Sequence, residues 1–309
     1  MRTRIKKNVL YVTGILVLIM TFTPLACTVN SDNGTAAAPV ENTAAMEQDQ
    51  VAKKRKLLFE EATAAIRETQ NALKALDEKQ NADALAALER ASGKLTIMLG
   101  RDPELALAPS HVHTVTYDIL ADVDEVKKLR RKIEKALDAG RVQQARHMIR
   151  HLASETVISV TNIPLATYPE AIKEAARLID NNKTEEAKQV LQAALNTLVI
   201  TDTIIPLPVT MAEALLKEAE TLTEKKDRSE DENNRLAELL KETRTKLEFA
   251  QALGYGDKDD FENLYEQIEV IEEKTAGGKS GAGFFDTIKG YLKDVVASSQ
   301  PESLPEASE

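Results

Sequence analysis

The sequence predicts a mostly α-helical protein made of helical-hairpin repeats, with room for very short β segments where the hairpins exit. Three observations support this class. Tryptophan is absent and aromatic residues are 4% of the chain, so a core must be built from aliphatic side chains and alanine. Apolar residues recur at three- and four-residue steps from Val51 onward, which is the period of an amphipathic helix. One hairpin pattern also occurs three times.

Residues 1–27 are predicted to be a signal peptide or a lipoprotein signal, because the basic stretch MRTRIKK precedes an uncharged apolar run. Cys27 is the single cysteine and the candidate for lipidation. Ala26 suits a lipidation motif, whereas Pro24 and Leu25 suit it poorly. Three interpretations stay open: a lipid on Cys27, cleavage to a free exported protein, or an uncleaved N-terminal anchor. All three place the protein in the periplasm or cell envelope.

Residues 28–50 are polar and alanine-rich, so we expect a flexible tether that cannot bury apolar surface. Residues 51–274 follow as the helical domain. A chain with one cysteine forms no internal disulfide, so this domain must be stabilised by its core alone.

The repeated pattern is an aspartate that follows an aliphatic residue, then an alanine seven positions later, then an aliphatic residue four positions after that. Each aspartate is expected at the end of a first helix and each alanine at a close helix crossing. The three copies of this pattern are Asp77, Ala84 and Leu88; Asp138, Ala145 and Ile149; and Asp180, Ala187 and Leu191.

The second and third copies align without a gap at an offset of 42 residues. Both end in Ile-Pro-Leu, which we call the first elbow (Ile163, Pro164, Leu165) and the second elbow (Ile205, Pro206, Leu207). Proline ends the preceding element and leucine can anchor the next helix, so the elbows are repeated corners. If the two corners lie side by side, they form a candidate apolar groove for a client protein.

Three β-branched stretches, HVHTVTYD, TVISVTNI and TLVITDTII, interrupt the helical pattern. Each follows a hairpin, and together they could form a small sheet. After the helical domain, residues 275–283 are predicted to be a glycine-rich linker and 284–297 an amphipathic helix. That helix is expected to dock on the body, to pack in an oligomer or to lie on a membrane. Residues 298–309 are predicted to be a disordered tail.

The histidines form two pairs, His111 with His113 and His147 with His151. Each pair has a spacing that suits one face of a strand or a helix, so they are weak metal-ligand candidates. Arg146 and Arg150 flank the second pair and would repel a cation. An imidazole titrates at about pH 6.5, so a pH-responsive role is a further interpretation. No catalytic constellation or cofactor motif is recognised, which predicts a non-enzymatic protein without a cofactor.

The net charge is -10, and the basic residues at the start of the chain have no acidic neighbours, so the remainder is more acidic still. This balance argues against nucleic acid as a partner and against anionic lipid as the main one. Membrane contact is therefore expected only through a lipid or an N-terminal anchor. Expected partners are further copies of the chain and envelope protein clients.

Together these residues resemble the YfdX family of exported bacterial proteins. The resemblance depends on the hairpin units, the paired segments IPLATYPEAI and IPLPVTMAEALLKEA, and KLEFAQALGY, and it spans roughly Val51 to Lys274. It implies a mostly helical, exported, self-associating protein with a stress-protective, chaperone-like role and no established catalytic residues. Two alternatives remain: a pH- or metal-responsive sensor module that uses the histidine pairs, and a tetratricopeptide-like scaffold.

Overall fold

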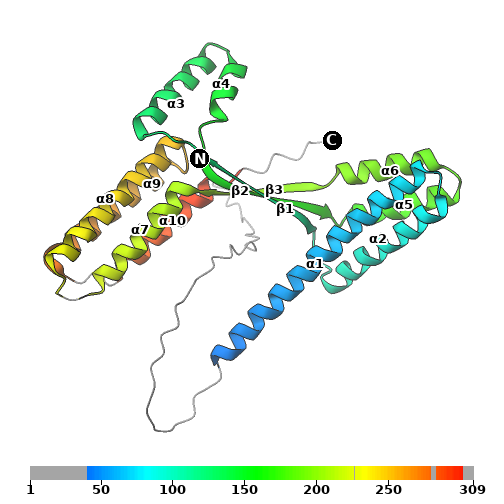
Figure 1. Cartoon of the computed structure of the whole chain (residues 1–309), viewed down its shortest axis with the longest axis horizontal. Coiled ribbons are helices and arrows are strands. Elements are labelled where there is room, and N and C mark those ends of the chain that lie inside the picture. The colour runs from blue at the N-terminus through cyan, green and yellow to red at the C-terminus, as the bar shows by residue number, and fades with distance from the viewer. Residues whose placement is uncertain (1–39, 226, 280–282, 302–309) are drawn as a thin grey trace, which may run out of the picture. The chain divides into compact units, whose positions relative to one another are not determined.

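In the computed structural model, the described residues are 40–225, 227–279 and 283–301, with side chains described from Gln50 onward (Figure 1). The chain divides into two units, Met1–Asp49 and Gln50–Glu309, and all side-chain contacts described below lie within the second. Cys27 and most of the predicted signal and tether lie outside the described residues. None of the helices in the described part is long and apolar enough to cross a membrane.

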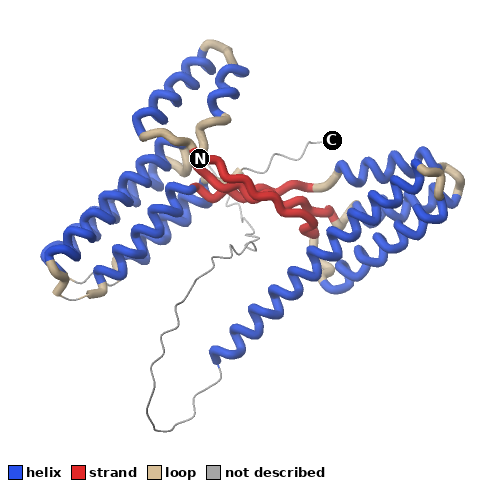
Figure 2. The backbone as a smooth tube through the Cα atoms, viewed as in Figure 1, coloured by secondary structure: helices blue, strands red, loops and turns tan. Residues whose placement is uncertain are grey.

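The described chain is mostly α-helical, as predicted, with one small sheet (Figure 2). A 3-10 turn, Ala276–Gly278, precedes α10. The elements in order are α1 (Val40–Asp77), α2 (Asn81–Arg101), β1 (Leu107–Asp118), α3 (Val123–Asp138), α4 (Val142–Ile149), β2 (Ser154–Pro164), α5 (Tyr168–Asp180), α6 (Thr184–Asn196), β3 (Val199–Pro206), α7 (Leu207–Thr223), α8 (Glu230–Leu253), α9 (Lys258–Thr275) and α10 (Phe285–Ser298).

The predicted repeat is confirmed as three hairpins: hairpin 1 (α1 and α2), hairpin 2 (α3 and α4) and hairpin 3 (α5 and α6). All three turn in the same way. The residue two positions after each aspartate has a positive φ, of 61° at Lys79, 68° at Gly140 and 59° at Asn182. One residue later, a backbone N–H donates to the carbonyl five positions earlier, at 2.8 Å in each hairpin. This closure satisfies carbonyls at the end of the first helix, so the local sequence alone defines the turn.

Hairpins 1 and 3 pack against each other. Helix α2 contacts α5, and Lys188 of α6 forms an ion pair with Asp77 of α1 at 2.9 Å. Their shared core also contains the first elbow, with Ile163 fully buried. Hairpin 2 has only a small cluster of its own around Ile133 and Ala145, and its α3 contacts α8. Hairpin 3 therefore packs on hairpin 1 and not on its neighbour in sequence, which differs from the sequential stacking of a tetratricopeptide-like scaffold.

The three β-branched exits form one antiparallel sheet in the order β1-β2-β3. The β segments predicted at the hairpin exits are confirmed, and their 12, 11 and 8 residues make them longer than the very short segments expected. Each strand is extended by pairing with the exit of another hairpin, for example Thr114 with Ile158 and Ile158 with Thr203. Such pairing joins residues far apart in sequence, which local propensity does not reveal.

Helices α7 to α10 enclose a second core. The predicted amphipathic helix is confirmed as α10, and its buried side chains include Phe285, Ile288, Leu292 and Val295. It contacts α7 and α9, so of the three expectations for this helix the structure shows docking on the body. Gln300, just after α10, accepts a hydrogen bond from the Ile204 N–H at 3.0 Å and donates to the Ile204 carbonyl at 2.8 Å.

Three predicted boundaries need correction. The tether was predicted to extend to residue 50, but α1 begins at Val40. The glycine-rich linker was predicted from 275, but its first part is fixed, because buried Arg228 donates to the carbonyls of Thr275 and Lys279 at 2.8 and 2.9 Å. The disordered tail was predicted from 298, yet Gln300 is bonded to Ile204. For the linker and the tail, the contact that orders the segment comes from elsewhere in the chain.

Candidate functional site

The two histidine pairs lie on different elements. His111 and His113 are exposed on β1, where they pair with Thr161 and Ser159 of β2. The rings of His147 and His151 stand edge to face with centroids 5.5 Å apart. Arg150 lies 3.2 Å from Nδ1 of His147. Within the described residues no group of three or more histidine, cysteine or acidic side chains is placed to hold a metal ion. Metal binding and pH sensing by these pairs therefore stay predictions.

The two elbows do not form the predicted groove. Pro164 ends β2 and is paired with Leu107, whereas Pro206 is paired with Glu155 at the other end of β2. Because the strands are antiparallel, equivalent exits leave the sheet at opposite ends, roughly 30 Å apart at about 3.3 Å per residue. Ile163 and Leu165 are 0% and 4% exposed inside the first core and offer no surface to a client. The groove of Ile163, Pro164, Leu165, Ile205, Pro206 and Leu207 was therefore wrongly predicted.

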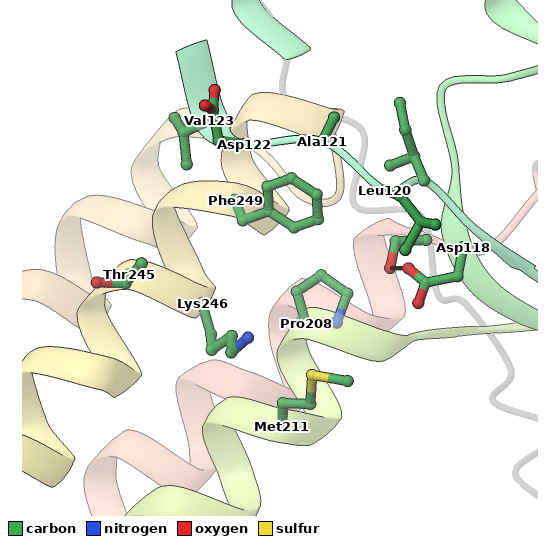
Figure 3. Close-up of a pocket in the computed structure, with 12 residues that line it drawn as sticks. Asp118, Leu120, Ala121, Asp122, Val123, Pro208, Met211, Thr245, Lys246 and Phe249 are labelled. Atoms are coloured by element: carbon green, nitrogen blue, oxygen red, sulfur yellow. Dashed lines mark hydrogen bonds between the residues drawn. The ribbon is translucent and has the colours of Figure 1, made fainter. Parts of the chain in front are cut away.

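A cleft does lie beside the second elbow (Figure 3). Its volume is about 480 Å³, which is within the range of small-ligand and peptide side-chain sites. Four segments form its wall: the end of β1 with the β1–α3 connection, the start of β2, the start of α7 and the C-terminal half of α8. The lining residues are Asp118, Ile119, Leu120, Ala121, Asp122, Val123, Ser154, Pro208, Met211, Thr245, Lys246 and Phe249.

The cleft combines an apolar wall with charges of both signs. Figure 3 shows the Phe249 ring beside the β1–α3 connection, with Pro208 and Met211 of α7 facing the same space. Leu120, in the β1–α3 connection, is 97% exposed, so its side chain is free to contact a bound molecule. Lys246 lines the same cleft as Asp118. This arrangement suits an extended peptide segment with one or two apolar side chains and a polar backbone.

A hydrogen-bond chain supports the wall of the cleft. Ser154 donates through Oγ to Asp118 at 2.7 Å, and its backbone N–H donates to the Tyr255 hydroxyl at 2.9 Å. Tyr255 in turn donates to Glu155 at 2.8 Å. The burial of Tyr255, followed by its hydrogen bond to Glu155, raises the pKa of the phenol well above its ordinary value. These hydrogen bonds join the end of β1 and the start of β2 to the turn after α8, and they thereby position Asp118.

Tyr255→Phe should change the alkaline limit of stability. The folded state keeps the Tyr255 phenol protonated. The stability that this raised pKa contributes is therefore present in full below a pH of about 10, the ordinary tyrosine pKa. It is lost as pH rises toward the higher pKa of the folded state, because only the unfolded chain ionises there. We expect the variant to be less stable by about 1–3 kcal/mol at pH 8, from its two lost hydrogen bonds. Its stability should then fall less steeply between about pH 10 and 11.5.

Urea unfolding at a series of pH values measures this effect, and Tyr117→Phe is the matched control because Tyr117 is 47% exposed. Parallel pH profiles for wild type and Tyr255→Phe would show that the hydroxyl is not protected in the folded state.

Sequence reasoning did not find the cleft, because its four wall segments are far apart in the chain. Only the second elbow pointed to this region, since Pro208 directly follows Leu207. A short apolar stretch, Ile119 to Ala121, lies between Asp118 and Asp122 at the end of a β-branched run. It is the one local signal that could have indicated the cleft.

Comparison with known proteins agrees with the resemblance drawn from the repeat. The YfdX protein family model matches residues 65–204. This part of the chain is similar to the YfdX family. The YfdX match spans the end of α1 through most of β3, and so covers all three hairpin turns and the sheet. The region of resemblance was predicted to extend to Lys274, but the matched residues end before α7 and before KLEFAQALGY.

Among solved structures, one of Salmonella Typhi YfdX is similar, with a TM-score of 0.33 and 13% sequence identity. The similarity covers 48% of this chain and 91% of that chain. A search of curated proteins finds no match. The cleft lies partly outside the YfdX match, because its α7 and α8 walls follow residue 204.

Proposed function

We propose that this protein is a non-enzymatic, chaperone-like interaction module of the cell envelope that self-associates and holds apolar segments of unfolded client proteins. The observation that carries the proposal is the cleft of about 480 Å³ with its exposed Leu120. Unfolded chains expose the apolar side chains that such a cleft can take up. The basic and apolar start of the chain supports export, with attachment to the membrane through Cys27 or an N-terminal anchor as the two anchored forms.

The edge of the sheet offers a second point of contact for a client. β1 is an edge strand and ends at Asp118 on the rim of the cleft. A client segment that pairs with the outer edge of β1 would make backbone hydrogen bonds that do not depend on its sequence. Its next residues would then reach the apolar wall of the cleft. Backbone pairing together with an undemanding apolar cleft suits a protein that protects many clients.

The test uses reduced insulin, whose B chain aggregates, as the client, with light scattering as the readout. Wild type should suppress aggregation, and Leu120→Asp and Met211→Asp should each weaken B-chain binding about 5–30-fold, from the loss of roughly 1–2 kcal/mol of apolar contact. Both side chains are exposed, at 97% and 45%, so the variants should fold. Ile97→Asp is the matched control, because Ile97 on α2 is 47% exposed and does not line the cleft.

Two results would count against the proposal. If wild type does not suppress aggregation at a stoichiometric ratio, the protein is not chaperone-like towards this client. If wild type suppresses aggregation but both cleft variants act like Ile97→Asp, clients bind elsewhere on the protein.

A further inference from the structure

The three hairpins share one sequence pattern, but its positions are buried to different degrees. The alanine seven residues after each aspartate is 0% exposed in all three hairpins, at Ala84, Ala145 and Ala187. This position therefore belongs to the contact between the two helices of one hairpin. A small side chain is needed there because the two helices approach closely.

The exposure of the other two apolar positions distinguishes hairpin 2 from hairpins 1 and 3. The residue before the aspartate and the residue four after the alanine are buried in hairpins 1 and 3 and exposed in hairpin 2. Val142, at the start of α4, is also exposed, by 56%. The exposed fractions are 0% for Leu76, 46% for Leu137 and 3% for Ile179 at the first position, and 1% for Leu88, 47% for Ile149 and 0% for Leu191 at the second.

These two positions are buried in hairpins 1 and 3 because the two hairpins cover each other. The second helix of hairpin 1 contacts the first helix of hairpin 3. The first helix of hairpin 1 is joined to the second helix of hairpin 3 by the ion pair of Asp77 and Lys188. A reciprocal exchange of this kind is what a local two-fold axis between two equivalent units produces. The chain thus contains one example of how such hairpins pair.

Hairpin 2 has the groups that this pairing uses. At the offset of 42, Arg146 stands where hairpin 3 has Lys188, and Asp138 is the counterpart of Asp77. Both side chains are exposed, and in the part of the chain that the structure describes neither forms an ion pair. The first half of α3 already packs against the rest of the chain. Val126 is buried there, and Arg130 donates to the carbonyl of Ala252 in α8 at 3.1 Å. The region around Leu137 and Ile149 remains without a partner in the described chain.

We propose that hairpin 2 pairs with hairpin 2 of a second copy, in the way that hairpins 1 and 3 pair within one chain. Arg146 of each copy then faces Asp138 of the partner subunit, and Leu137, Val142 and Ile149 become buried. The inference depends on the proposed self-association and assigns its surface. A second copy fits better than a client because the surface carries both members of the ion pair, and a two-fold axis satisfies both at once.

The test is a charge exchange in the purified protein, measured by light scattering after size-exclusion chromatography and by sedimentation. Asp138→Arg and Arg146→Glu each place like charges opposite one another twice in the dimer, so each should raise the dissociation constant by about tenfold or more. An equimolar mixture of the two variants should dimerise again, because every facing pair is then of opposite sign. Native mass spectrometry should identify the restored species as a heterodimer, which a contact within one chain cannot produce.

Lys135→Glu is the matched control for charge. Lys135 lies on α3 of the same hairpin, and its counterparts Lys74 and Arg177 are exposed in the hairpins that do pair. The control should dimerise like wild type, and circular dichroism should show that all variants are folded.

The outcomes separate the two proposals. A wild-type protein that stays monomeric at about 100 µM, well above the micromolar dissociation constants of ordinary weak complexes, overturns self-association and its surface together. A wild-type oligomer that neither single variant weakens overturns only the surface. Single variants that weaken association without recovery in the mixture overturn the pairing of Arg146 with Asp138.

Discussion

Phe285→Ala should lower the free energy of unfolding by about 3–5 kcal/mol, the usual cost of removing a fully buried aromatic ring. Phe285 is 0% exposed and belongs to the core formed by α7 to α10. It stands at the start of α10. The cavity left by the ring would weaken the contacts of α10 with α7 and α9. Urea unfolding followed by far-ultraviolet circular dichroism measures the change.

Asp294→Ala on the same helix is the matched control, because Asp294 is exposed and its replacement should change stability by less than about 0.5 kcal/mol. Equal effects of the two substitutions would mean that α10 is not part of the folded unit. The helix would then be free for an oligomer or a membrane, as the other two sequence-based expectations had it.

The hairpins could be predicted from the sequence because their turns are local. The aspartate, the residue with positive φ and the following alanine lie within eight positions, so each turn is determined by its own residues. Lys79 shows how strong this local pattern is, since it adopts a φ of 61° without being glycine or asparagine. Element boundaries were less predictable, because Arg228 and Gln300 order segments that look like linker and tail by composition alone.

The sheet and the candidate site could not be predicted to the same degree, because they depend on pairing over long distances. The β-branched composition of β2 indicated a strand, but its direction relative to β3 decides where each elbow lies. Sequence equivalence of the elbows was therefore misinterpreted as closeness in space. The cleft requires Leu120, Pro208 and Phe249 to meet, and no periodicity joins these positions.

Ile163→Ala should lower the free energy of unfolding by about 2–5 kcal/mol, the range for truncating a buried isoleucine to alanine. Ile163 is 0% exposed where the end of β2 meets the core of hairpins 1 and 3. Its neighbour Leu165 is 4% exposed, and its N–H donates to the Ala106 carbonyl at 2.9 Å. The surroundings are held by backbone bonds and cannot close around a cavity without breaking them. Urea unfolding provides the measurement, with B-chain binding recorded in parallel.

Ile205→Ala is the control that the repeat itself supplies, because Ile205 holds the same position in the second elbow but is only partly buried on the sheet. Its truncation should cost about 1 kcal/mol, since part of the side chain is already in water. A clear difference between the two variants, with client binding unchanged in both, would confirm that the first elbow is a structural corner. Similar small costs with weakened client binding in both variants would contradict the assignment of the first elbow as a structural corner. In that case the Ile-Pro-Leu sequence would have the same role in both copies. The antiparallel sheet instead gives the two copies different roles, because the first elbow closes a core and the second leads the chain to the wall of the cleft.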